Sequence, residues 1–257
     1  MKYTQVIDLK GFLEEKYLQY NRSFFIESDP ISIPYAFSLK EDIEIASFLS
    51  SIIAWGQRKT IINNARKLME YMGNSPYEFI MDFNEENKSC RQLKNFVHRT
   101  FNGTDCIFFV RSLQHIYKHK GGLETIFSIK ETDKNVATSI VNARKCFFEI
   151  DFPHRSLKHF SNPLAGSAAK RINMFLRWMV RKDRVDFGIW KSIQPSQLIC
   201  PLDVHTGNVS RKLGLLTRSQ NDWKAAEQLT ESLLLFDPID PVKYDFALFG
   251  LGVFENF

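Results

Sequence analysis

The sequence of 257 residues has little cysteine and no long hydrophobic run. No C-x-x-C pair occurs, and wide, uneven spacings separate Cys90, Cys106, Cys146 and Cys200. We therefore expect buried free thiols, with neither a metal nor another cofactor. No apolar run approaches the about 18 residues of a membrane-spanning helix. Residues 1–10 lack the basic start and apolar core of a signal peptide, which predicts an intracellular, cytoplasmic protein without a membrane partner.

Signals for β-structure are weak as well. No sustained alternation of apolar and polar residues occurs, and no Asn-Gly turn separates two β-branched runs. Apolar residues recur instead at helical spacing, which predicts helices over residues 43–54, 60–72, 106–117, 139–150, 170–181, 223–236 and 242–254. Caps are expected at Asn102–Asp105 and Asn221–Asp222, and the polar range 84–94 fits either a loop or an exposed helix.

The composition favours a single all-α domain. Hydrophobic residues make up 44% and charged residues 25%, which is typical of a globular protein, and 23 phenylalanines predict an aromatic core. Because no linker divides the chain, residues 1–257 are expected to form one helical domain, with two lobes around a cleft.

Positive charge is concentrated in residues 154–184. The formal charge of this range is +7. Because the whole chain has a net charge of +5, the remaining residues carry −2. Its basic residues are Arg155, Lys158, Lys170, Arg171, Arg177, Arg181, Lys182 and Arg184. Such a concentration indicates either a local site for a polyanion or a solvated helix face.

The chemistry is predicted to reside in two segments. In the first, LAGSAAKRIN (residues 164–173), a turn containing Gly166 leads into a helix that starts near Lys170. The backbone N–H groups of such a turn can bind phosphate, and a helix N-terminus disfavours a protonated amine, which favours a nucleophile. The alternative is an ordinary surface lysine.

The second segment is residues 199–216, ICPLDVHTGNVSRKLGLL. Pro201 is expected to end any regular structure before it, and Asp203 is expected to cap the helix that follows. A capping carboxylate is held rigidly, which is compatible with catalysis. His205 is either a proton carrier or a structural residue.

Together these segments resemble the helix-hairpin-helix superfamily of DNA glycosylases. LAGSAAKRIN is similar to the endonuclease III-type hairpin, L-P-G-x-G-x-K-T-A-N, at Leu164, Gly166, Lys170 and Asn173. The second segment is similar to V-D-x-H-x-x-R-V-x-x-R-L-G-L, and Asp203 and His205 fall on its Asp-x-His. Upstream, Gln57 falls where the family places a glutamine that enters the DNA stack or base pocket. Ala165 and Ala168 depart from the hairpin pattern. The 33 residues from Lys170 to Asp203 resemble the spacing of the archaeal 8-oxoguanine glycosylase branch.

The resemblance implies an all-α, helix-hairpin-helix glycosylase-like fold, with the hairpin at about 157–181 and the catalytic segment at about 199–216. Lys170 is the implied nucleophile and Asp203 the implied catalytic carboxylate. The implied partner is double-stranded DNA containing a damaged base, bound by a monomeric enzyme that needs no cofactor. The implied DNA-binding residues are Gln57, Gly166, Ser167, Arg171, Arg177, Arg181 and His205.

Two alternatives stay open. One is a non-catalytic nucleic-acid-binding protein that retains the fold, which the altered hairpin favours and the retained Lys170 and Asp203 disfavour. The other is a helical protein–protein module whose aromatic residues form its core and interface. The basic range 154–184 disfavours the second alternative.

Overall fold

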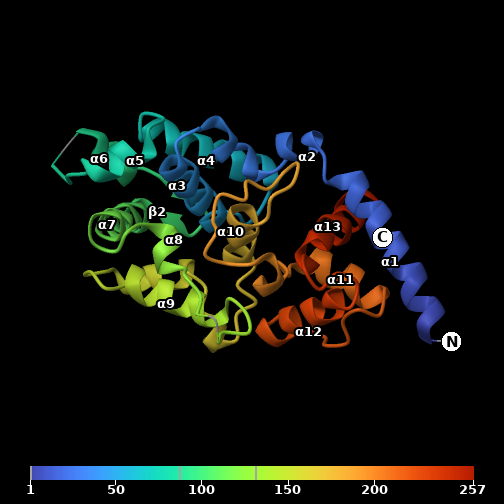
Figure 1. Cartoon of the computed structure of the whole chain (residues 1–257). Coiled ribbons are helices and arrows are strands. Elements are labelled where there is room, and N and C mark those ends of the chain that lie inside the picture. Colours follow the sequence, from blue (N-terminus) through green and yellow to red (C-terminus); the bar gives the residue numbers. More distant parts are fainter. Residues whose placement is uncertain (1, 87, 131) are drawn as a thin grey trace. The chain divides into compact units, whose positions relative to one another are not determined.

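The computed structural model describes residues 2–86, 88–130 and 132–257 and confirms the expected all-α class. Helices make up nearly all of the regular structure (Figure 1). Within the described residues, the only strands are β1 (Val97–His98) and β2 (Phe101–Asn102), which form a short antiparallel pair. None of the described helices is both long and apolar enough to span a membrane.

The chain forms two compact units. Unit 1 consists of Met1–Phe25, Glu131–Ala137 and Asn162–Phe257, whereas unit 2 consists of Ile26–Lys130 and Thr138–Ser161. The expected single domain with a cleft between two lobes stays a prediction.

Unit 2 is built from short and medium helices. Its α-helices are α3 (Lys40–Ile52), α4 (Arg58–Tyr71), α5 (Pro76–Met81), α6 (Lys88–Lys94), α7 (Gly103–His119), α8 (Leu123–Ile126) and α9 (Ala137–Phe147), of which the last begins one residue outside the unit. Its 3-10 helices are η1 (Pro30–Ser32), η2 (Pro34–Ala36) and η3 (His154–His159). Helix α3 packs on α4 and α5, and α7 packs on α5 and α6.

Phenylalanine rings fill the core of unit 2, as the composition predicts. The ring of Phe147 lies 4.7 Å from that of Phe109 and 5.4 Å from that of Phe160, measured between centroids. Phe48 and Phe108 also contact Phe147, and all five side chains are buried. Each such ring removes a large apolar area from water and thereby stabilises the packing of α3, α7 and α9.

Among its described residues, unit 1 contains five longer helices and several short ones. They are α1 (Lys2–Tyr20), α10 (Lys170–Val180), α11 (Val204–Lys212), α12 (Trp223–Leu234) and α13 (Asp245–Phe254), with 3-10 helices η4 (Pro163–Ala165), η5 (Pro195–Gln197) and η6 (Pro241–Tyr244). Helix α2 (Ser23–Glu27) crosses the boundary between the units. Helix α13 packs against both α1 and α11 (Figure 1).

Most expected helices occur close to their expected positions, and three features differ. The sequence pattern did not predict α1, whose apolar residues do not form a continuous stripe. The expected helix 242–254 is divided into η6 and α13, with Asp245 as the first residue of the α-helix. The polar range 84–94, left open between loop and helix, contains α6.

The contact between α1 and α13 depends on a glycine. A Cβ added to Gly250 would lie 2.2 Å from Cδ2 of Tyr20, so no larger residue fits without movement of the ring or the helix. The same end of α1 is tied to the chain end, because the Tyr20 hydroxyl donates to Glu255 and Lys16 Nζ lies 2.7 Å from Glu255 Oε1. Gly250 therefore sets the distance between the two helices.

We expect Gly250→Ala to destabilise the protein. Overpacking of this kind costs about 1–3 kcal/mol. Because the contact with Tyr20 is so short, we expect a cost near the upper end of this range. That cost exceeds the about 1 kcal/mol by which alanine stabilises a helix relative to glycine. Gly11→Ala in α1 is the matched control, because no atom lies within 4 Å of its added Cβ and the exchange should stabilise the helix. Urea unfolding measures both, and equal stability of Gly250→Ala and wild type would contradict the packing described.

Candidate active site

The hairpin turn before α10 is held by hydrogen bonds within itself. It consists of η4 and Gly166, whose φ of 83° lies in the left-handed region that favours glycine. The Gly166 amide donates to the Pro163 carbonyl at 2.9 Å, and the Ser167 amide donates to the Asn162 carbonyl at 3.3 Å. The turn itself uses both of these amides, and phosphate binding by the turn stays a prediction.

Helix α10 starts directly after this turn. Ala169 has a φ of 48°, which is uncommon for alanine, and its amide donates to Ser167 Oγ at 3.2 Å. Asn173 closes the first helical turn, because its amide donates to the Ala169 carbonyl and its Nδ2 to the Ala168 carbonyl. These bonds fix the backbone on both sides of Lys170, the first residue of the helix.

Asp203 caps the N-terminus of α11, as the sequence predicts. Its Oδ1 accepts a hydrogen bond from the Thr206 amide at 2.9 Å. Its carbonyl accepts a second bond from Asn221 Nδ2 at 3.1 Å, a contact that sequence reasoning missed. Gly207 makes room for this asparagine, since a Cβ there would lie 2.7 Å from Asn221 Oδ1. The main chain and one carboxylate oxygen of Asp203 are therefore fixed, and Oδ2 has another neighbour.

That neighbour is the amine of Lys170. Lys170 Nζ lies 3.8 Å from Asp203 Oδ2, so the structure brings together the two residues predicted to share one site. The side chains are 27% and 24% exposed, respectively. Both come from the start of a helix in unit 1, and a reactant from solvent can reach them.

Arg177 and Arg181, predicted to bind DNA phosphate, are instead buried in ion pairs. Their exposures are only 3% and 1%. Arg177 Nη1 lies 2.5 Å from Asp245 Oδ2, and its Nε lies 3.3 Å from Asp186 Oδ1. Arg181 also contacts Asp186, and its Nε lies 2.7 Å from Asp240 Oδ1. The prediction is corrected because these guanidinium groups are enclosed by carboxylates inside unit 1.

The carboxyl groups of this network have perturbed acidities. Burial raises the pKa of Asp186 to about 7, although Arg177 and Arg181 lower it. Burial likewise raises the pKa of Asp245 to about 6, and the Arg177 charge again acts in the opposite direction. The charge of Asp203 also raises the pKa of Asp245, and the charge of Lys170 lowers it. The network therefore extends electrostatically to the candidate site.

The other predicted binding residues lie in different surroundings. Arg171 is half-buried, and burial lowers its pKa to about 10, so it stays protonated at neutral pH. His205 is exposed in the first turn of α11. Gln57 is exposed at the N-cap of α4 and belongs to unit 2. Of the aromatic residues near these segments, Phe175 and Trp178 are fully buried core residues.

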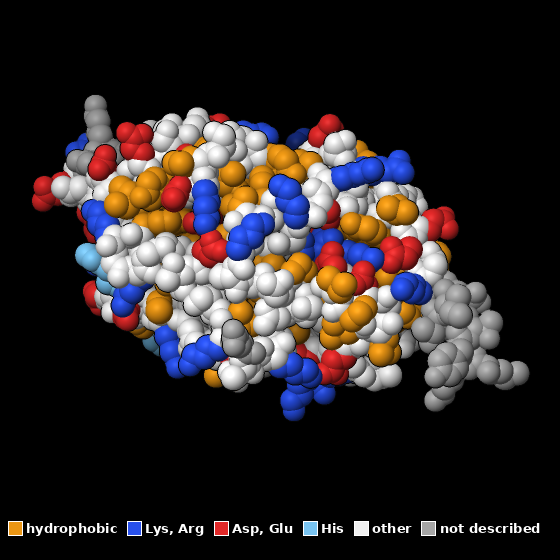
Figure 2. All heavy atoms as spheres, viewed as in Figure 1, with side chains coloured by type: hydrophobic (Ala, Val, Ile, Leu, Met, Phe, Trp, Pro, Cys, Tyr) orange, Lys and Arg blue, Asp and Glu red, His pale blue; other side chains and the backbone are white. Residues whose placement is uncertain are grey.

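Only part of the basic range 154–184 reaches the surface. Arg155, Lys158, Lys182 and Arg184 are exposed, whereas Lys170 and Arg171 are half-buried. On the face shown in Figure 2, Lys and Arg side chains are interspersed with acidic and hydrophobic ones rather than gathered in one band. The sequence count therefore overstates the positive charge that this range offers to a polyanion.

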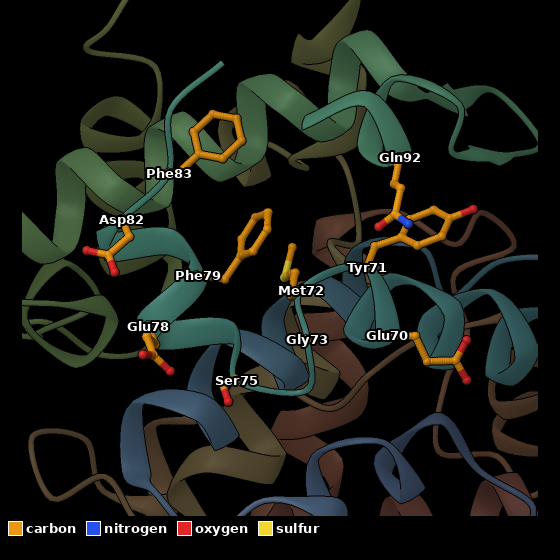
Figure 3. Close-up of a pocket in the computed structure, with 10 residues that line it drawn as sticks. All are labelled: Glu70, Tyr71, Met72, Gly73, Ser75, Glu78, Phe79, Asp82, Phe83 and Gln92. Atoms are coloured by element: carbon orange, nitrogen blue, oxygen red, sulfur yellow. The ribbon is translucent and has the colours of Figure 1, made fainter. Parts of the chain in front are cut away.

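A pocket of about 470 Å³ lies in unit 2 and is lined by residues between Glu70 and Gln92, far in the sequence from Lys170 and Asp203. Figure 3 shows it between α4, α5 and α6, where the rings of Phe79 and Phe83 approach one another. Their centroids are 5.9 Å apart. Glu70, Glu78 and Asp82 also line the pocket, and neither Lys170 nor Asp203 does. This pocket is thus no part of the candidate active site.

The four cysteines are free thiols. Cys90, Cys106 and Cys200 are buried as expected, whereas Cys146 is half-buried. Burial raises the pKa of the Cys200 thiol well above its ordinary value, which keeps it protonated. Among the described residues, no group of three or more His, Cys, Asp or Glu side chains is arranged to hold a metal ion.

We expect Arg181→Met to destabilise the protein strongly. The substitution leaves buried Asp186 with one guanidinium fewer and removes the partner of Asp240, and breaking a buried pair in this way costs about 3–5 kcal/mol. Arg184→Met, at an exposed position three residues later, should change the free energy of unfolding by less than about 0.5 kcal/mol. Denaturant unfolding of the two variants compares them directly. A stable Arg181→Met variant with weakened DNA binding would restore the phosphate-binding role.

Comparison with known proteins yields one family. No curated protein and no solved structure matches the chain. The model of the family described as "Protein of unknown function (DUF2400)" matches residues 29–254, a range that includes Lys170, Asp203 and the buried network. Since this match covers most of the sequence, the chain belongs to the DUF2400 family.

Proposed function

We propose that the protein is a DNA glycosylase with lyase activity, of the helix-hairpin-helix type, which removes a damaged base from double-stranded DNA. The observation that carries the proposal is the 3.8 Å separation of Lys170 Nζ and Asp203 Oδ2. A pair this exposed contributes at most about 1 kcal/mol to stability. Stability alone therefore gives little reason to hold an amine and a carboxylate together at two helix N-termini.

The surroundings of the pair support this choice of chemistry. A tight turn precedes Lys170, and Asp203 follows later in the chain as a helix cap, which is the order of the superfamily that the sequence resembles. One oxygen of Asp203 is held by the Thr206 amide, so the other keeps a fixed direction toward the amine. Such preorganisation is what stabilises charge that develops during a reaction.

The proposed reaction starts with a damaged nucleotide turned out of the duplex. The lone pair of the neutral Lys170 amine forms a bond to the sugar C1′ while the bond from C1′ to the base breaks. The base leaves with that electron pair and takes up a proton. The amine nitrogen then loses its extra proton. Its lone pair forms a double bond to C1′ as the C1′–O4′ bond breaks, O4′ keeps the electrons of that bond and takes up a proton, and a protonated Schiff base results. Asp203 stabilises the positive charge on the sugar.

The lyase step follows from the same intermediate. Loss of a proton from C2′ supplies the electrons that expel the 3′ phosphate, which breaks the strand by β-elimination. Water then releases Lys170 from the Schiff base. No step requires a metal or a redox cofactor, and 8-oxoguanine is the proposed lesion because of the sequence spacing alone.

DNA contacts in this proposal come from the turn and its flanks rather than from Arg177 or Arg181. Leu164 at the tip of the turn is 79% exposed, and Lys182 and Arg184 are exposed beyond the end of α10. A non-catalytic DNA-binding protein is the competing function, favoured by the internal use of the turn amides. Activity of the wild-type protein decides between the two.

We expect Lys170→Gln to abolish both base release and covalent trapping on lesion-containing DNA by borohydride. The variant lacks the only amine assigned to the covalent intermediate, whereas DNA binding should change little. Asp203→Asn keeps the shape of the cap but removes the charge, and loss of such a charge stabiliser costs about 3 kcal/mol or more of the barrier. Trapping yield and single-turnover base release, measured on a panel of lesions that includes 8-oxoguanine opposite cytosine, provide the test.

Lys182→Gln serves as the matched control, because it removes an exposed lysine beyond the same helix. It should preserve trapping and turnover. Persistent trapping by Lys170→Gln would assign the nucleophile to another residue. A wild-type protein that binds DNA without turnover on any lesion would favour the non-catalytic function.

A further inference from the structure

We propose that the buried Arg177–Asp245 ion pair is the positioning element of the candidate active site. It joins the helix that carries Lys170 to α13 and sets the charge environment in which the Lys170 amine and Asp203 meet. The inference rests on the proposed function of the Lys170–Asp203 pair, and it adds two positioning residues that do not themselves touch the reacting atoms.

The pair lies on the same side of α10 as Lys170. Arg177 follows Lys170 by seven residues, which is two turns at about 3.6 residues per turn, so the two side chains share a face. Arg177 Nη1 lies 2.5 Å from Asp245 Oδ2, and the guanidinium carbon lies 4.3 Å from the ring centroid of Phe246. An ion pair and a cation–π contact thus fix α10 to the first turn of α13.

Helix α13 also contacts the helix that Asp203 caps. A Cβ added to Gly252 would lie 3.0 Å from Cβ of His205 and 3.2 Å from Cγ2 of Val209, so α11 and α13 approach closely there. His205 is two residues beyond Asp203 in the same helix. Helix α13 therefore links the supports of both candidate active-site residues, and displacement of its first turn changes their separation.

The same pair is coupled to the site through charge. The Asp245 carboxyl faces Arg177 and Lys170 from α10, Asp203 from the start of α11, and Cys200 from the segment before it. Burial is the largest cause that raises the pKa of Asp245, Arg177 lowers it, Asp203 raises it, and Lys170 lowers it. Such coupling is reciprocal, so a change of charge at Asp245 must alter the titration of its neighbours.

Asp245→Asn tests the inference, with Asp186→Asn as its matched control. Both aspartates are buried and both contact Arg177. The charges of Lys170 and Asp203 contribute to the pKa shift of Asp245, whereas the shift of Asp186 is caused by burial and by Arg177, Arg181 and Asp183. The first measurement is the pH dependence of reductive methylation at Lys170 in the free protein, read by peptide mass spectrometry. Loss of the Asp245 anion leaves the Arg177 charge uncompensated, so methylation of Lys170 should begin at a lower pH in Asp245→Asn only.

The second measurement is turnover on lesion DNA. Misplacement of reacting groups by about 1 Å costs about 100-fold in rate. We therefore expect Asp245→Asn to lower kcat by about 10- to 100-fold, while KM changes by less than about 3-fold because the DNA-contacting surface is intact. Arg177→Met should behave likewise, and Arg177→Lys should restore part of kcat. Asp186→Asn should lose thermal stability but keep kcat within about 3-fold of wild type.

The two measurements separate this inference from the proposed function. A shifted methylation profile in a protein without glycosylase activity would support the positioning role and overturn the function. An unshifted profile in folded Asp245→Asn overturns the inference whatever the activity. Equal losses of kcat in Asp245→Asn and Asp186→Asn would also overturn it, because the network would then serve stability alone.

Discussion

Two guanidinium groups, those of Arg177 and Arg181, lie inside unit 1 among the carboxyl groups of Asp183, Asp186, Asp240 and Asp245. Removing such charges from water is costly, so each must stay close to its partners. Because the partners come from α10, the loop after it, the segment before η6 and the start of α13, this requirement fixes where these segments lie. Burial raises the pKa values of Asp186 and Asp245, and the nearby carboxylates Asp183 and Asp203, respectively, raise them further.

Helical periodicity predicted α3, α4, α7, α9, α10 and α12 from the sequence alone, and polar residues predicted the caps at Asn102, Asp203 and Asp222. Local chemistry suffices for these elements because apolar spacing and cap hydrogen bonds operate within a few residues. Helix α1 depends instead on a distant contact, the fit of Tyr20 against Gly250. The spacing of residues within α1 contains no information about that partner.

The candidate site was predictable in part for the same reason. Lys170 and Asp203 were identified from two local patterns, whereas Asn221 and Asp245 reach the site only through the tertiary fold. The basic range 154–184 wrongly predicted surface positions for Arg177 and Arg181. Their carboxylate partners Asp186, Asp240 and Asp245 lie beyond this range in the sequence. One signal was present: residues 172–180 are apolar except for Asn173 and Arg177. A helix of this kind is buried, so its arginine requires buried carboxylates.

The starts of three helices meet in this part of unit 1. Asp203 and Asp245 are carboxylates at the N-termini of α11 and α13, which helix dipoles stabilise, whereas Lys170 is a cation at the N-terminus of α10, which its own helix dipole opposes. Ala169, immediately before it, adopts a left-handed conformation that is costly for alanine. Two locally unfavourable choices at adjacent positions persist only where the surrounding structure compensates for them, here through Asn173 and Asp203. Sequences depart from local preference in this way mainly at functional or strained sites, and this physical reason, independent of any family likeness, supports a functional amine at Lys170.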